Sequence, residues 1–140
     1  MLRILLVNPG FQNPHPPLGL GYLSAYLKRH LSSPVEVLLY DEIGPEGDIA
    51  PTVHDFRPDL VGISVVTPTF RRALDLCRHI RGVSPAPIVA GGPHITALPE
   101  SITGTDIGVA VIGEGEETCL ELVQSLQLAG TVKDPRIRGL

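Results

Sequence analysis

The chain has 140 residues, 43% hydrophobic and 19% charged, with a formal net charge of −4. This length suits one globular domain with a sizeable core, and the acidic balance argues against nucleic acid as the main partner. The two cysteines, Cys77 and Cys119, lack the spacing of a disulfide framework or a zinc site and indicate a reducing cytosol. The apolar run near the amino terminus is too short for a signal peptide. We therefore expect a cytoplasmic protein without a membrane segment.

Five short apolar runs follow one another along the chain, and each ends in a turn-forming residue. Near-continuous runs of valine, isoleucine and leucine are typical of strands that are buried on both faces, as in parallel sheets. The predicted strands are Leu2–Val7, Val35–Tyr40, Leu60–Val66, Pro87–Ala90 and Ile107–Ile112.

Amphipathic patterns lie between these runs, with apolar residues at spacings of three and four. The patterns predict helices over Leu18–Leu31, Thr69–Arg81 and Glu116–Leu128, and shorter helices over Ile49–Phe56 and Pro99–Thr103. Alternating strands and helices form right-handed βαβ units, with helices on both faces of the sheet. We therefore predict an α/β fold of the flavodoxin-like, Rossmann-type class, a doubly wound five-stranded parallel sheet in the order 2-1-3-4-5. The domain would occupy residues 1–129, and residues 130–140 would form a polar tail or linker.

The carboxyl ends of the predicted strands carry many small and turn-forming residues. In an open α/β sheet, ligands bind at this edge, near the point where the strand order reverses. Glycine lets the backbone approach a ligand closely, and serine and threonine add short donors and acceptors. Each loop alone is consistent with a simple tight turn, but four of them at one edge favour a bulky ligand with a flat apolar face. The loops contain Asn8–Gly10 with Leu18–Gly21, Ser64–Thr69, Gly91–His94 and Gly113–Glu116.

Several familiar sites are absent from the sequence. No P-loop and no nucleophile elbow is present. The segment Leu18–Gly21 matches part of a dinucleotide fingerprint, but Ser24 occupies the position of the third glycine. His15 and His94 lie where they could reach a ligand, and a structural role suits each of them at least as well as metal binding. We predict no catalytic residue and no metal ligand in this chain.

Four segments, in this order, resemble the N-terminal domain of cobalamin-binding radical S-adenosylmethionine enzymes. They are Pro16–Leu23, Asp59–Ser64, Gly91–His94 and Val111–Glu116, and the likeness runs from about Leu2 to Leu126. The resemblance implies that cobalamin binds at the sheet edge, with its nucleotide tail in a pocket between the sheet and the helices.

The same resemblance implies which residues meet the cofactor. Hydroxyl residues after the third strand would contact the nucleotide tail or the corrin amides, and the loop after the fourth strand would line the tail pocket. The loop after the fifth strand would border the corrin ring, and the start of the first long helix would lie near its lower face. The predicted cofactor-binding residues are Leu18, Gly19, Ser64, Val66, Thr67, Thr69, Gly91, Gly92, Pro93, His94, Gly113 and Glu114.

Two departures from related cobalamin proteins refine this prediction. The motif D-x-H-x-x-G, whose histidine ligates cobalt from below, is not matched, because His15 precedes Gly19 by four residues and Asn13 replaces the aspartate. We therefore expect cobalamin without a protein histidine ligand to cobalt. The motif C-x-x-x-C-x-x-C is also missing. An iron–sulfur cluster and S-adenosylmethionine would therefore belong to a downstream catalytic domain that this chain lacks.

The sequence thus favours a cobalamin-binding module that is not catalytic alone. It would present the cofactor to a radical S-adenosylmethionine domain of the same natural chain, for methyl transfer or another radical reaction. Two alternatives stay open. In the first, the domain has lost cobalamin and serves as a scaffold or substrate lid. In the second, the domain is a flavin-binding, flavodoxin-like redox protein. The hydroxyl-rich first loop that would hold a flavin phosphate is absent, which weighs against the last alternative.

Overall fold

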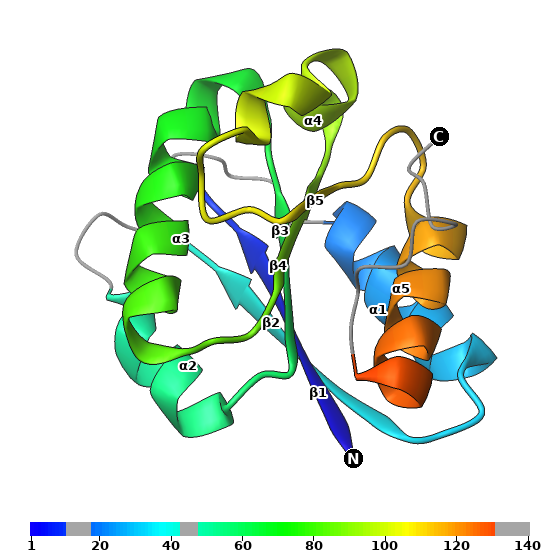
Figure 1. The fold of residues 1–140 in the computed structure, drawn as a ribbon. Coiled ribbons are helices and arrows are strands. Elements are labelled where there is room, and N and C mark those ends of the chain that lie inside the picture. Colours follow the sequence, from blue (N-terminus) through cyan, green and yellow to red (C-terminus); the bar gives the residue numbers. More distant parts are fainter. Residues whose placement is uncertain (11–17, 43–47, 131–140) are drawn as a thin grey trace.

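A five-stranded parallel sheet forms the centre of the computed structural model, which describes residues 1–10, 18–42 and 48–130 (Figure 1). The strands lie in the order β2-β1-β3-β4-β5, so the predicted flavodoxin-like fold and its strand order are confirmed. The order reverses between β1 and β3, which places the expected ligand edge there. The strands are β1 (Leu2–Asn8), β2 (Val35–Asp41), β3 (Leu60–Ser64), β4 (Ile88–Gly91) and β5 (Val109–Ala110).

Helices cover both faces of the sheet. Figure 1 shows α1 and α5 side by side on one face and α2 and α3 on the other, with α4 at the carboxyl edge. Their bounds are α1 (Leu18–His30), α2 (Ile49–Phe56), α3 (Phe70–Val83), α4 (Pro93–Ala97) and α5 (Glu116–Ala129), and the short 3₁₀ helices are η1 (Thr67–Thr69) and η2 (Pro99–Ile102).

The alternation of side chains along β1 divides the core into two halves. Leu5 and Val7 pack with α2 and α3, whereas Ile4 and Leu6 pack with α1 and α5. All four side chains are buried. Burying an aliphatic side chain of this size contributes about 1.5–3 kcal/mol, so both helical layers are held to the sheet mainly by apolar burial.

The structure corrects three sequence-based expectations near the carboxyl edge. β5 has only two residues in place of Ile107–Ile112, because only Val109 and Ala110 pair with β4, its one neighbour. β3 ends at Ser64, and the segment that follows turns into η1. The third correction is α4, which begins directly after the two glycines, where the sequence suggested no more than a turn. Proline suits its first position because that position needs no amide hydrogen.

The carboxyl-terminal segment is only partly described. α5 ends at Ala129, and Gly130 follows with φ +69°. Residues 131–140 lie outside the described residues, so the boundary between domain and tail stays a prediction. Among the described helices, none combines the length and the apolar character that a membrane span requires.

Candidate functional site

Hydrogen bonds join the loops that follow β3, β4 and β5. Ser64 pairs in register with Gly91, and the Val65 amide donates to the Gly91 carbonyl at 2.8 Å. The His94 amide donates to the Val65 carbonyl at 3.1 Å. The Gly113 amide donates to Oγ1 of Thr96 at 2.9 Å. Three of the predicted ligand loops therefore form one connected edge.

Gly92 is the residue that this edge requires to be glycine. Its φ of +101° and ψ of 177° lie in a region that is essentially restricted to glycine. A Cβ atom there would lie 2.7 Å from the Val65 carbonyl oxygen and 2.9 Å from the Val65 nitrogen. At Gly91 a Cβ would meet its nearest neighbour, the Val111 oxygen, at 3.7 Å, an ordinary contact. Gly92 therefore allows the third and fourth loops to approach each other closely.

A cavity of about 210 Å³ opens at this edge and runs between the sheet and helices α1 and α5. The structure brings together five of the predicted residues in its lining, namely Gly19, Ser64, Gly91, Gly92 and Gly113. Gly62 in β3 was not among the predicted residues, yet it also lines the cavity, and a Cβ there would lie 2.9 Å from Cδ2 of Leu6. A lone glycine inside a run of β-branched residues is a signal of close approach, and it would have pointed to this residue.

Apart from Leu18, the remaining predicted residues lie outside the cavity lining. Val66 and Glu114 are exposed on loops at the carboxyl edge, Thr67 and Pro93 are exposed at the first positions of η1 and α4, and Thr69 is half-buried. The Thr69 hydroxyl donates to the Val66 carbonyl at 3.1 Å and accepts from the Val66 amide at 3.3 Å. Leu18 is the first residue of α1. His15, weighed above as a metal ligand, lies outside the described residues.

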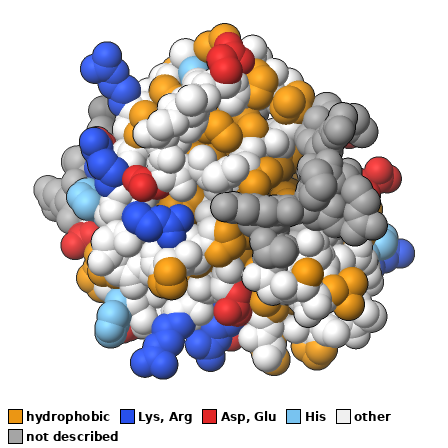
Figure 2. All heavy atoms as spheres, viewed as in Figure 1, with side chains coloured by type: hydrophobic (Ala, Val, Ile, Leu, Met, Phe, Trp, Pro, Cys, Tyr) orange, Lys and Arg blue, Asp and Glu red, His pale blue; other side chains and the backbone are white. Residues whose placement is uncertain are grey.

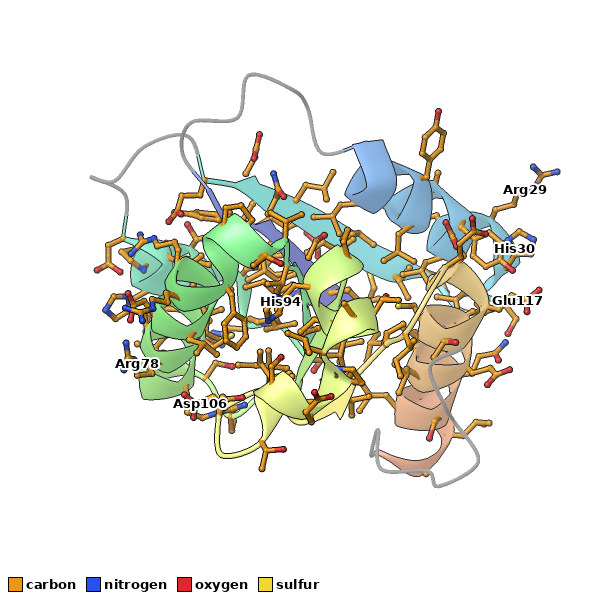
Figure 3. The ribbon with its side chains drawn as sticks, turned by 90° about the horizontal axis from the view of Figure 1, so that it is seen from above. Arg29, His30, Arg78, His94, Asp106 and Glu117 are labelled. Atoms are coloured by element: carbon orange, nitrogen blue, oxygen red, sulfur yellow. The ribbon has the colours of Figure 1, made fainter. Side chains whose placement is uncertain are left out.

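His94 is buried and takes part in the packing of the loops. Its Nδ1 lies 3.1 Å from Oγ1 of Thr67, and its ring stacks on Phe70 with centroids 4.3 Å apart. Its Nε2 is buried without a hydrogen-bond partner. Figure 3 shows His94 in the interior beside α3, whereas Arg29, His30 and Glu117 lie at the outside of α1 and α5. His94 therefore ties the fourth loop to the start of α3.

An ion pair fixes the start of the first loop. The Glu42 side chain is 1% exposed, and Arg72 donates to both of its carboxylate oxygens at 2.6–3.0 Å. The same carboxylate accepts from the Gly10 amide at 3.2 Å. Hydrogen bonding to Glu42 raises the pKa of Arg72. Arg72 on α3 therefore has a buried partner that lies 30 positions away in the sequence.

The electrostatics of the site do not suggest a metal or anion centre. Figure 2 shows the lysine and arginine side chains mostly over the side of α2 and α3, interspersed with carboxylates. No three His, Cys, Asp or Glu side chains in the described ranges are arranged to hold a metal ion. Burial raises the pKa of Cys77 and of Cys119 to about 12, so both thiols are protonated at neutral pH.

Comparison with known proteins decides the family. Residues 4–123 match the B12 binding domain family. The chain belongs to this family. The match includes the loops at the carboxyl edge, α1 and the first part of α5, so the cavity lies within the family's domain.

Known relatives of this B12-binding domain include much longer proteins. It is 31% identical to the uncharacterized methyltransferase PH0819 of Pyrococcus horikoshii, over 95% of this chain and 31% of that protein. The radical S-adenosylmethionine methyltransferase TsrM of Kitasatospora setae, solved with cobalamin and a [4Fe-4S] cluster bound, superposes with a TM-score of 0.76 at 25% identity. The cobalamin-dependent S-adenosylmethionine radical enzyme OxsB, solved with aqua-cobalamin and S-adenosylmethionine, superposes with a TM-score of 0.76 at 25% identity.

These superpositions cover 94% and 91% of this chain. They cover only 25% of TsrM and 19% of OxsB. The chain therefore corresponds to less than a third of each of these three proteins.

Proposed function

We propose that this B12-binding domain binds cobalamin, with the corrin ring over the carboxyl edge of the sheet and the nucleotide tail in the cavity below α1 and α5. The observation that carries the proposal is the apolar cavity that opens beside Gly92. An apolar cavity of about 150 Å³ holds benzene, so a cavity of about 210 Å³ suits a base of two fused rings. TsrM and OxsB, which share the fold, were solved with cobalamin and aqua-cobalamin.

The residues of the site fit such a ligand by position. Gly91 and Gly92 keep the mouth of the cavity free of side chains, so that the nucleotide can pass close to the backbone. Ser64 at the end of β3 offers a hydroxyl at the same mouth. Thr67 offers a second hydroxyl, which His94 orients on the exposed surface of the edge. Bound cobalamin would supply the cobalt chemistry, such as methyl transfer, that side chains cannot perform.

We further propose that cobalt receives no histidine ligand from this chain. The first loop departs from D-x-H-x-x-G at Asn13 and in the spacing of His15. Among the described residues, the histidine nearest the edge is His94, which is buried against Phe70. Electron paramagnetic resonance of the bound cobalt(II) form tests this point. The spectrum of His15→Ala should equal that of the wild type, and loss of a nitrogen splitting in the variant would refute the proposal.

The partner that we propose is a radical S-adenosylmethionine catalytic domain of the same natural protein. The larger size of TsrM and OxsB supports this, because this chain corresponds to a minor part of each. The iron–sulfur cluster and S-adenosylmethionine would bind in that partner domain. A gene that encodes C-x-x-x-C-x-x-C after this domain would support the assignment, and a gene without it would refute the assignment.

Titration with hydroxocobalamin tests the proposed ligand directly. At a free concentration one hundred times the dissociation constant, binding stabilises the fold by about 2.7 kcal/mol. For a chain of this size that corresponds to a rise in melting temperature of roughly 8 °C. A visible spectral change should accompany it. If neither occurs, cobalamin binding is refuted and the scaffold or lid alternative is favoured, whereas stabilisation by flavin mononucleotide would favour the redox alternative.

A pair of glycine variants connects binding to the cavity. Gly91→Leu places a side chain in the lining of the cavity and should abolish the response to hydroxocobalamin. Gly82→Leu is the control, because a Cβ at this exposed position of α3 meets nothing within 4 Å. Both variants should keep a cooperative thermal transition. Equal cobalamin affinity in the two variants would place the ligand elsewhere.

A further inference from the structure

The cavity walls are almost entirely aliphatic. Leu6, Leu60 and Val89 line the cavity from the sheet, and Leu23, Leu27 and Val123 line it from the two helices. Among the described residues, the polar side chains in the lining are those of Ser64 and Glu116, each at the carboxyl end of the cavity, where β3 ends and α5 begins. Cys119 also lines the cavity, and its protonated thiol is only a weak hydrogen-bond donor. The interior of the cavity therefore offers little to a polar ligand.

Several backbone groups next to the cavity are already paired. The Ala90 carbonyl accepts from the Val111 amide at 2.8 Å, and the Gly91 carbonyl accepts from the Val65 amide at 2.8 Å. The Gly113 amide donates to Thr96, and the Gly115 carbonyl accepts from the Cys119 amide at 2.7 Å. The glycines thus provide space without leaving these donors and acceptors available. A polar group that entered the aliphatic part would lose its bonds to water and gain few in return.

We propose that this cavity selects among cobamides by the lower base, accepting dimethylbenzimidazole and discriminating against adenine. This inference rests on the proposed function, because it assumes that the nucleotide tail enters the cavity. Adenine has an exocyclic amino group and two ring nitrogens on its six-membered ring, where dimethylbenzimidazole has C–H and methyl groups. The two bases are similar in size, so the difference between them is mainly one of polarity.

The expected discrimination follows from the cost of unpaired polar groups. One buried donor or acceptor without a partner weakens binding by about tenfold to a hundredfold. The methyl groups of dimethylbenzimidazole add to the difference, because each gains from burial against leucine and valine. We therefore expect cobalamin to bind at least about tenfold more tightly than the adenine cobamide.

Calorimetric titration of the wild-type chain with three corrinoids tests the proposal. The ligands are cobalamin, the adenine cobamide and cobinamide, which has no base. All are used as dicyano forms in excess cyanide, so that no base is bound to cobalt beforehand. Cobalamin should bind with the highest affinity, and the affinity for the adenine cobamide should be closer to that for cobinamide. Equal affinity for cobalamin and the adenine cobamide would overturn the inference and leave the proposed function standing. Absence of binding by all three would overturn both.

A variant pair on α5 links the preference to the cavity. Cys119→Phe reduces the space available to the base and should shrink the preference for cobalamin over the adenine cobamide to less than about threefold. Leu126→Phe is the matched control, because Leu126 packs on the same core but does not line the cavity. It should keep the wild-type preference. An unchanged preference in a folded Cys119→Phe variant would overturn the assignment, and the wild-type titrations decide the matter if that variant does not fold.

Discussion

The glycine pair at the end of β4 gives the sharpest test of the site geometry. Gly91→Ala and Gly92→Ala make the same chemical change at adjacent positions, yet the structure predicts different results. At position 92, the backbone conformation of φ +101° and ψ 177° is strained for any residue with a Cβ atom. The new carbon would also lie 2.7 Å from the Val65 oxygen, a backbone atom that cannot rotate away. At position 91, the nearest atom would lie at 3.7 Å.

The expected loss of stability follows from these contacts. A residue held in such a backbone region costs about 1–3 kcal/mol, and displacing the Val65 backbone brings the expected loss for Gly92→Ala to about 2–4 kcal/mol. Gly91→Ala should change the free energy of unfolding by less than about 1 kcal/mol, because alanine also restricts the unfolded chain. In a chain of this size, 1 kcal/mol shifts the melting temperature by about 3 °C.

Urea unfolding of the ligand-free chain, followed by circular dichroism, measures both variants. The transition midpoint of Gly92→Ala should fall while the slope stays at the wild-type value, because the unfolded surface does not change. If the free energies of unfolding of the two variants agree within about 0.5 kcal/mol, the close approach of the third and fourth loops is refuted.

Three further predictions concern the ion pair, the thiols and His94. Glu42→Gln should lower the free energy of unfolding by about 2–3 kcal/mol, because it leaves Arg72 without its buried partner. Glu36 forms an ion pair that is roughly half exposed, so Glu36→Gln should lower the free energy of unfolding by less than about 1 kcal/mol. Equal losses of stability for the two variants in urea unfolding would contradict this prediction. Burial raises the pKa of Cys77 and Cys119 from 9.0 to about 12, so the folded chain holds protons that the unfolded chain releases in that window. The free energy of unfolding should therefore be at its full value below about pH 9 and fall above it by up to about 1.4 kcal/mol per pH unit for each thiol. Urea titrations across the window measure this slope, and an unchanged slope after replacement of both cysteines by alanine would refute its assignment to the thiols. His94→Phe should leave the melting temperature unchanged or raise it by up to about 3 °C, because it removes a buried nitrogen that has no partner. A large fall in the melting temperature, measured by calorimetry, would show that the hydrogen bond to Thr67 outweighs the cost of the unpaired nitrogen.

The sequence was sufficient to predict most of the fold because the signals for it are local. The unbroken apolar run of β1 and the periodic pattern of α3 each depend on neighbouring residues. The extent of β5 was overestimated because only two of its residues pair with β4, and this pairing depends on a distant part of the chain. The helix α4 was missed because Gly92 and Pro93, usually signs of a turn, are here the residue before a helix and its first position.

The site was predictable only in part, because it too depends on residues that lie far apart in the sequence. The glycines at the strand ends were visible in the sequence, and the topology alone brings them to one edge. The cavity was not visible, because it depends on how the side chains of α1 and α5 pack on the sheet. The Glu42–Arg72 pair joins residues that are 30 positions apart, and no local pattern indicates such a pair.

The two faces of the sheet differ in a way that connects packing with binding. The face under α2 and α3 is filled by large, fully buried side chains such as Ile49, Leu76 and Ile80. The face under α1 and α5 has the same apolar character, but glycines at positions 19, 62 and 115 line the cavity there. A glycine inside a helix or strand costs about 0.5–1 kcal/mol relative to alanine, and an unfilled cavity loses packing contacts as well. The α2–α3 face is therefore filled by the chain itself, and under the proposed function a ligand would complete the α1–α5 face. This asymmetry is the reason that we expect an apolar ligand base, and not a polar one, to complete the core.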